Sequence, residues 1–195
     1  MLTKQRTISN PVSITGIGLH TGNHCTLTFK PAQENYGIRF KRIDLKDSPE
    51  ILADIDHVIE KVLKMKTIAV VGLSKDPAKP SHDVAKFMQS HGYHIVPINP
   101  TIDEVLGEKS YPSLLKLPDE LKREIDVVDI FRRAEDVPPI VAEAVQVHSK
   151  TGRPKAVWMQ LGIVNGEAAQ AAAESGIDVV MDRCMKIEFS RQLNR

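Results

Sequence analysis

The chain has 195 residues, which is enough for one ample hydrophobic core with an appendage. Its 26 Lys and Arg residues balance 25 Asp and Glu residues, so the net charge of +1 predicts neither nucleic acid nor an anionic membrane as a partner. Aromatic residues make up only 5%, which also disfavours a surface for stacking bases. The two cysteines, Cys25 and Cys184, lie far apart, which favours a reduced chain over a disulfide scaffold.

The first residues, "MLTKQRTISN", lack the apolar segment of a signal peptide, and no apolar run approaches the length of a membrane span. We therefore expect a cytoplasmic protein. Between Thr7 and about Phe40, "VSITGIGL", "CTLTFKP" and "GIRFKRID" alternate apolar and polar residues. Gly22-Asn23 is a candidate turn between the first two. This pattern predicts a small antiparallel β segment.

From "IEKVLKM" onward, helix and strand patterns alternate. The expected strands are the apolar runs "TIAVVGL", "YHIVPINP", "IDVVDIF", "KAVWMQLG" and "DVVMDRC". The expected helices between them are "SHDVAKFMQSHG", a mixed short helix in "SLLKLPDELKR", "AEDVPPIVAEAVQVHSK" and "NGEAAQAAAESG". Ser81 is the expected N-cap of the first of these, and Gly92 its C′ residue. The order predicts an α/β fold with a doubly wound parallel sheet.

Polar, charged and glycine residues follow the expected strands, where ligands bind in sheets of this kind. After the first four strands come, in order, Gly72, Ser74, Lys79, Pro80 and Ser81; Asn99 and Pro100; Phe131, Arg132 and Arg133; and Gln160. Gly72 permits close backbone approach, the following helix start favours an anion, and Lys79 adds a positive charge. Arg132 and Arg133 also fit a solvated pair. The convergence of these groups favours a phosphorylated ligand.

The region from about Ile59 to Leu193 resembles the small bacterial CoA-binding protein family, which is similar in fold to the nucleotide-binding domain of succinyl-CoA synthetase α subunits. The resemblance runs through "VVGLSKDPAKPSHDVAKFM", "GYHIVPINPTIDEVLGEKSYPSL", "VVDIFRRAEDVP", "VWMQLGIVNGEAA" and "VVMDRCMKIEFSR". It implies a Rossmann-like domain that binds coenzyme A. The residues after the first strand would line the phosphates, Asn99, Pro100 and Phe131 to Arg133 would border the nucleotide, and Gln160 completes the expected site.

The first part, "KQRTISNPVSITGIGLHTGNHCTLTFKPAQENYGIRFKRIDL", resembles the opening of the zinc-dependent UDP-3-O-acyl-N-acetylglucosamine deacetylase of lipid A synthesis. That family holds its zinc with two histidines and an aspartate, which belong to a Glu-His pair and a His-x-x-x-Asp motif, and neither pattern occurs here. His20 and His24 flank a glycine-containing turn, so we expect no metal. Residues 1–58 are thus expected to be a deacetylase-like fragment, fused to a CoA-binding domain at 59–195.

Four functions follow from these patterns. The first is a binder of CoA or an acyl-CoA without catalysis, since His94 and His148 have no acidic partner suggested by spacing and no catalytic residue stands out. The second is the deacetylase. The third is a nicotinamide-nucleotide binder, against which stands the missing GxGxxG turn. The fourth is an interaction module, in which the N-terminal strands add to a partner's sheet edge or form a homo-oligomer.

Overall fold

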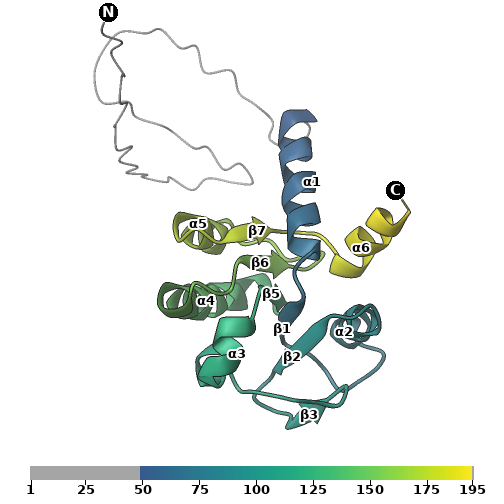
Figure 1. Ribbon diagram of the computed structural model, residues 1–195, viewed down its shortest axis with the longest axis vertical. Coiled ribbons are helices and arrows are strands. Elements are labelled where there is room, and N and C mark those ends of the chain that lie inside the picture. Colours follow the sequence, from purple (N-terminus) through teal and green to yellow (C-terminus); the bar gives the residue numbers. More distant parts are fainter. Residues whose placement is uncertain (1–48, 195) are drawn as a thin grey trace, which may run out of the picture. The chain divides into compact units, whose positions relative to one another are not determined.

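A computed structural model describes the backbone of residues 49–194 and the side chains from Ile55 onward (Figure 1). The expected β segment of residues 7–40, with His20, His24 and Cys25, lies outside these residues. Within them, no helix is both long and apolar enough to cross a membrane.

A five-stranded parallel sheet forms the centre of the domain, in the order β2-β1-β5-β6-β7 (Figure 1). Its strands are β1 (Thr67–Val71), β2 (His94–Ile98), β5 (Val127–Ile130), β6 (Ala156–Met159) and β7 (Asp178–Val180). All five expected strands and the doubly wound α/β class are confirmed. β1 lies between β2 and β5, so the chain changes direction across the sheet between β1 and β5, which is the topological switch point.

Helices cover both faces of the sheet. They are α1 (Pro49–Leu63), α2 (Pro80–Ser90), α3 (Asp119–Glu124), α4 (Val137–Thr151), α5 (Gly166–Glu174) and α6 (Met185–Leu193), with the short 3₁₀ helices η1 (Leu114–Lys116) and η2 (Ala134–Asp136). A two-stranded antiparallel hairpin, β3 (Glu104–Val105) and β4 (Glu108–Lys109), lies in the crossover from β2 to β5. The expected helices are confirmed, whereas α6 and the hairpin were missed.

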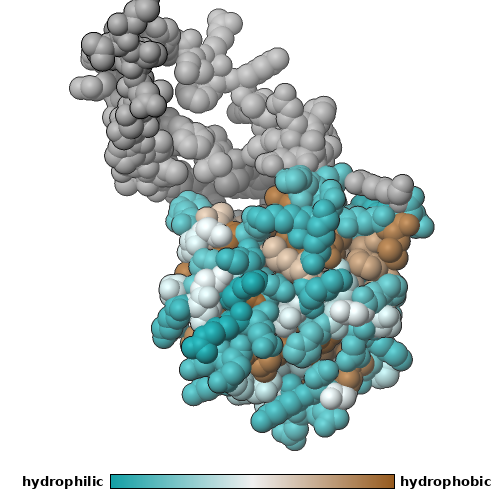
Figure 2. All heavy atoms as spheres, in the orientation of Figure 1, coloured by the Kyte–Doolittle hydropathy of each residue, from teal (hydrophilic) through white to brown (hydrophobic). Residues whose placement is uncertain are grey.

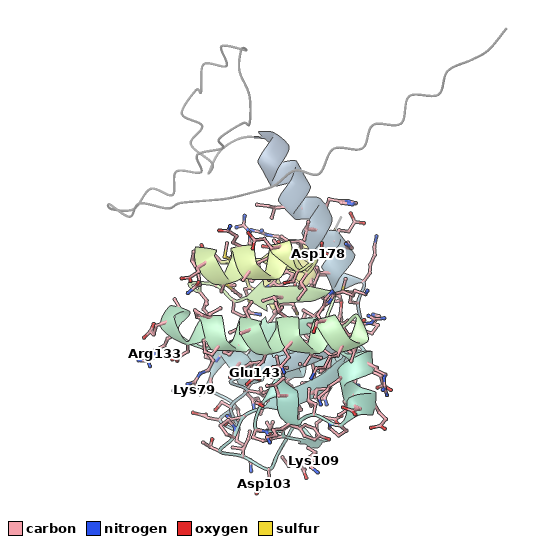
Figure 3. The ribbon with its side chains drawn as sticks, turned by 90° about the vertical axis from the view of Figure 1, so that its left-hand side faces the viewer. Lys79, Asp103, Lys109, Arg133, Glu143 and Asp178 are labelled. Carbon is pink, nitrogen blue, oxygen red and sulfur yellow. The ribbon has the colours of Figure 1, made fainter. Side chains whose placement is uncertain are left out.

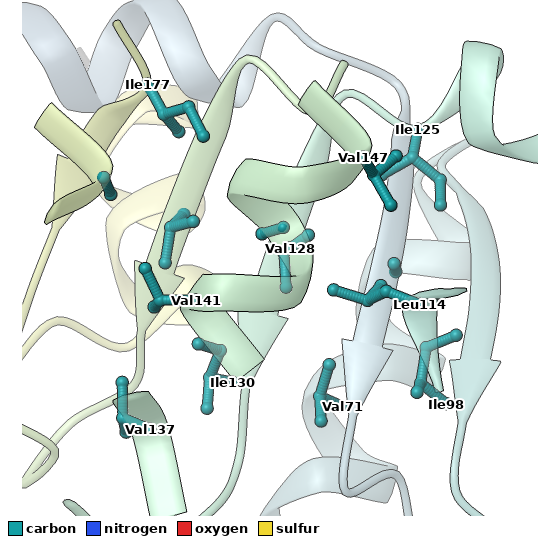
Figure 4. Packing of buried hydrophobic residues seen from close by; sticks show 14 of the residues in the cluster. Val71, Ile98, Leu114, Ile125, Val128, Ile130, Val137, Val141, Val147 and Ile177 are labelled. Carbon is teal, nitrogen blue, oxygen red and sulfur yellow. The ribbon is translucent and has the colours of Figure 1, made fainter. Parts of the chain in front are cut away.

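Alternating side chains of the strands divide the core into two layers. Ile68 and Val70 of β1 pack with residues of α1, α2 and α6, whereas Val71 faces the other layer. Figure 4 shows this second layer, in which Val71 and Ile98 meet Leu114 of η1, and Val141 of α4 packs over the sheet. Burying such a side chain stabilises the fold by about 1.5–3 kcal/mol. The two layers hold the carboxyl ends of the strands in a fixed arrangement.

The prediction of Ser81 as an N-cap is wrong. Helix α2 begins at Pro80, its N-cap residue is Lys79, and the side chain of Lys79 caps no amide. Pro fits the first position of a helix because its missing N–H would lack a helical partner there. Gly92 does follow the helix end with φ of +82°, as expected of a C′ glycine.

On the face shown in Figure 2, the described residues are mostly hydrophilic, and apolar side chains appear in small separate groups. Scattered apolar residues of this kind are ordinary for a protein surface. This face therefore offers no extended apolar patch.

Candidate functional site at the switch point

Two turns meet at the switch point: the one that leaves β1 and the one that leaves β5. Phe131 N donates to Val71 O at 2.9 Å, and Gly72 N donates to Ile98 O at 2.9 Å. Gly72 has φ of +86°, and a Cβ placed on it would lie 2.6 Å from the carbonyl oxygen of Phe131. Gly72 is therefore required both for its backbone conformation and for the close approach of the two turns.

Buried side chains hold the first turn. Ser74 N donates to Ser81 Oγ at 3.1 Å, and the carbonyl of Ser74 accepts from His82 Nδ1 at 3.0 Å. The carbonyl of Leu73 accepts from Asn99 Nδ2 at 2.9 Å. Ser81 and His82 are buried, so these hydrogen bonds are shielded from water. The expected site residues Ser81 and Asn99 thus shape the turn from inside.

Several backbone N–H groups of this turn donate hydrogen bonds to acceptors within the turn itself. Asp76 N donates to Ser74 Oγ at 3.1 Å, Ala78 N to Asp76 Oδ1 at 2.9 Å, and Lys79 N to Asp76 O at 3.0 Å. These amides are already engaged and do not face a ligand. Lys79 and Pro80 are exposed, so the positive charge of Lys79 is accessible. Side chains carry most of this turn's capacity to bind an anion.

The β2 end is closed by a compact hydrogen-bonded turn. Asn99 Oδ1 accepts from Thr101 N at 3.0 Å and from Thr101 Oγ1 at 2.8 Å, while the carbonyl of Asn99 accepts from Ser110 Oγ at 3.1 Å. Pro100 is exposed beside it. Asn99 is therefore a structural link between the ends of β1 and β2, and Pro100 presents the accessible surface.

The turn after β5 carries exposed cations. The side chain of Arg132 is 53% exposed and that of Arg133 is 75% exposed. Both guanidinium groups lie 3.4 Å from Asp136 Oδ2, and Arg133 also lies 3.3 Å from Glu135. Exposed ion pairs of this kind contribute about 0–1 kcal/mol, so a ligand phosphate can replace the carboxylates. Figure 3 shows Arg133 and Lys79 at the same edge of the domain.

Gln160 lies at the end of β6 but points into the protein. Its Nε2 donates to both oxygens of Asp129, at 2.9 and 3.0 Å, and its Oε1 accepts from Met185 N at 3.4 Å. Burial raises the pKa of the Asp129 carboxyl to about 7, although the hydrogen bond from Gln160 acts in the opposite direction. The Gln160 amide is therefore occupied by the link between β5 and α6.

A cleft of about 140 Å³ opens beside the ends of β1 and β2 on the α4 face. It is lined by Val71, Ile98, Pro112, Ser113, Leu114, Pro139, Ile140 and Glu143. Glu143 Oε2 accepts from Leu114 N at 3.0 Å, so this carboxylate fixes one wall. Sequence patterns did not single out Ser113 or Glu143, because the cleft joins residues from η1 and α4 that are far apart in the chain.

No group of three or more His, Cys, Asp or Glu side chains in the described part of the chain is placed to hold a metal ion. Trp158 is fully buried, and its Nε1 donates to Arg183 O at 2.7 Å. Cys184 is half-buried immediately before α6. The accessible polar groups at the carboxyl edge include cations and hydroxyls, together with the carboxylates of Asp76, Glu135 and Asp182.

A parallel sheet with a small cleft and exposed cations near its switch point defines a Rossmann-like binding domain. Comparison of the sequence with known protein families shows that the chain belongs to the family of CoA binding domains, whose sequence profile matches residues 66–190. The uncharacterized Bacillus subtilis protein YneT is 42% identical over 135 residues, which cover 69% of this chain and 91% of that protein.

Solved structures agree with this membership. A hypothetical protein from Pyrococcus horikoshii OT3 is 34% identical, with a TM-score of 0.64 over 80% of this chain and 99% of the other. A dinucleotide-forming acetyl-coenzyme A synthetase from Ca. Korarchaeum cryptofilum is 27% identical, with a TM-score of 0.52, and the match covers 64% of this chain but 28% of the synthetase. The Rossmann-like fold is shared with both.

The first part of the chain is similar to a different family. The sequence profile of UDP-3-O-acyl N-acetylglycosamine deacetylase matches residues 5–74. The bifunctional LpxC/FabZ enzyme of Chlorobaculum tepidum is 57% identical over 70 residues, which are 36% of this chain and only 15% of that enzyme. Both expected resemblances are thereby confirmed. The two profiles overlap at residues 66–74.

Proposed function

We propose that the domain binds coenzyme A or an acyl-CoA at the switch point, without catalysing a reaction of its own. The observation that carries this proposal is the meeting of the Gly72 and Phe131 turns beside accessible cations, in a chain that belongs to a CoA-binding family. CoA is an anion with a planar base and a long, flexible arm, so its site needs positive charge, an apolar surface and an open exit.

The charges divide between the two turns. Lys79 comes from the first turn, and Arg132 and Arg133 come from the second. All three are exposed, and the arginines are paired only with carboxylates that a phosphate can replace. The hydroxyl of Ser74 accepts from Asp76 N, which leaves its O–H to donate to a phosphate oxygen. These four residues are the proposed phosphate contacts.

The cleft beside β1 and β2 is the proposed place of the adenine ring. Its volume of about 140 Å³ is well below the roughly 300–1,000 Å³ of pockets that enclose whole ligands, so it fits only one part of CoA. Its apolar lining suits a planar ring, and Glu143 supplies an acceptor for an amino group. Pro100 and Phe131 would border the nucleotide, while Asn99, Ser81 and Gln160 would act by shaping the site.

The proposed domain boundary stays at residues 58 and 59. Helix α1 runs without interruption from Pro49 to Leu63, so this proposed boundary lies within one helix. A deacetylase is the second candidate function, favoured by the 57% identity of the first part to the Chlorobaculum enzyme. Zinc analysis of the purified chain tests it: we expect no stoichiometric zinc, and bound zinc with release of an acyl group would support the deacetylase.

Calorimetric titration of the full chain tests the proposed function, using CoA and acetyl-CoA with NAD and ADP as controls. We expect saturable, one-site binding of the CoA compounds. Binding of NAD but not CoA would support a nicotinamide nucleotide as the ligand instead. Comparison of the two CoA compounds shows whether the acyl group adds affinity.

The proposed homo-oligomer is tested by measuring the mass of the protein at increasing concentration.

A further inference from the structure

The turn after β1 reaches a defined shape with only one glycine. A dinucleotide-binding turn uses three glycines, which allow a tight turn and close approach of the backbone to phosphate. Here Gly72 is followed by Leu73, Ser74, Lys75 and Asp76, none of which gives that freedom. The peptide groups of residues 72–74 are instead held from outside, by Ile98 O, Asn99 Nδ2, Ser81 Oγ and His82 Nδ1.

His82 makes the most informative of these contacts. A carbonyl oxygen only accepts hydrogen bonds, so the Nδ1 that lies 3.0 Å from Ser74 O must carry the proton. The side chain is buried in the first turn of α2, next to Ser81. The two adjacent residues therefore bind opposite sides of Ser74: Ser81 accepts from its N–H, and His82 donates to its carbonyl.

We propose that His82 is a positioning residue for the ligand, which fixes the first turn through the Ser74 carbonyl. This inference rests on the proposed CoA function. With the Ser74 backbone fixed, its hydroxyl faces the ligand in one orientation. Asp76 N donates to that hydroxyl, and Asp76 O accepts from Lys79 N, so the position of Lys79 depends on Ser74 as well. A turn that is already ordered loses less conformational entropy when the ligand binds, so the protein binds that ligand more tightly.

Two substitutions separate the hydrogen bond from the volume of the ring. His82→Phe keeps a buried aromatic ring but has no N–H. His82→Asn keeps an N–H donor close to the position of Nδ1 but has no ring. CoA affinity is measured by calorimetry, and amide hydrogen exchange of residues 73–79 is measured without ligand. Thermal unfolding confirms that each variant is folded.

We expect His82→Phe to weaken CoA binding about five- to tenfold and to speed exchange of the Ser74 amide. His82→Asn should restore affinity to within about twofold of the natural chain, since the donor is retained. Unchanged affinity and exchange in a folded His82→Phe variant would overturn the inference. Equal loss in both variants would also overturn it, because the ring volume would then be the cause.

The exchange measurement keeps this inference separate from the proposed function. If the natural chain binds no CoA, the proposed function fails. In that case faster Ser74 exchange in His82→Phe alone still supports the positioning of the turn, whereas equal exchange in all three proteins contradicts it.

Discussion

The two turns at the switch point are built in opposite ways. The turn after β1 is held by buried side chains, Ser81 and His82, and by Asn99 from the end of β2. The turn after β5 presents two exposed guanidinium groups whose partners are surface carboxylates. The first turn has a fixed shape, and the second has charges that can exchange partners. We infer that the proposed CoA site takes its fixed shape from the first turn and most of its positive charge, apart from Lys79, from the second.

Gly72→Ala should have the largest effect of the proposed substitutions, because Gly72 lies where the two turns meet. The new Cβ would lie 2.6 Å from Phe131 O in a residue with φ of +86°, so both strain and overlap oppose it. We expect the free energy of unfolding to fall by about 3–4 kcal/mol, measured by urea denaturation. Gly107→Ala is the matched control: its φ is +77° but its Cβ would meet nothing within 4 Å, so we expect a loss of about 1 kcal/mol. Equal losses would contradict the close approach of the turns.

Asp129 lies in β5 just before the second turn and should make stability depend on pH. Its pKa is raised to about 7, so the folded chain binds a proton between about pH 4 and 7, where the unfolded carboxyl has lost it. The unfolded state thus binds fewer protons, and stability should fall by roughly 3 kcal/mol as pH rises across this window. The difference in unfolding free energy between the natural chain and Asp129→Asn isolates this contribution. A difference that is constant with pH would contradict the raised pKa.

Removing the cations tests the second turn. Arg132→Ala combined with Arg133→Ala should weaken CoA binding by about 2 kcal/mol and reduce its salt dependence, while leaving the fold intact. The control, Lys150→Ala combined with Lys155→Ala, removes the same charge near the amino ends of the strands, where we expect little change. The affinity is measured by calorimetry at two salt concentrations. The same affinity loss in both double variants would mean that only net charge matters.

Asp136→Asn should have the smallest effect on CoA affinity of these substitutions. Asp136 Oδ2 lies 3.4 Å from both Arg132 and Arg133, so it competes with a ligand phosphate for them. Without this charge, we expect CoA to bind more tightly by about 0.5 kcal/mol. Weaker binding in the same titration would instead show that Asp136 orients the arginines for the ligand.

Much of the fold can be predicted from local patterns. The apolar run "TIAVVGL" predicts β1, because a strand covered by helices on both faces needs apolar side chains on both faces. Gly92 and Gly176 mark the ends of α2 and α5, since a left-handed residue after a helix favours glycine. α6 was missed because it follows the last expected strand, so no later strand marks it as a crossover helix.

The roles of the site residues depend on contacts that the sequence does not show. Ser81 was expected to cap a helix, yet its hydroxyl accepts from Ser74 N, because the path of the turn brings that amide to it. Nothing in the sequence connects Gln160 with Asp129, which lies 31 residues earlier. His82 and Glu143 were missed for the same reason: each looks like an ordinary polar helix residue until its partner is placed.

The most direct test of the account is to map the protection of backbone amides from hydrogen exchange when CoA is added to the full chain. We predict protection in residues 72–82 and 131–136, with little change at the amino ends of the strands. Protection of only one turn would contradict the division of shape and charge between the two turns. Protection confined to another region, with both turns unchanged, would contradict the switch-point site itself.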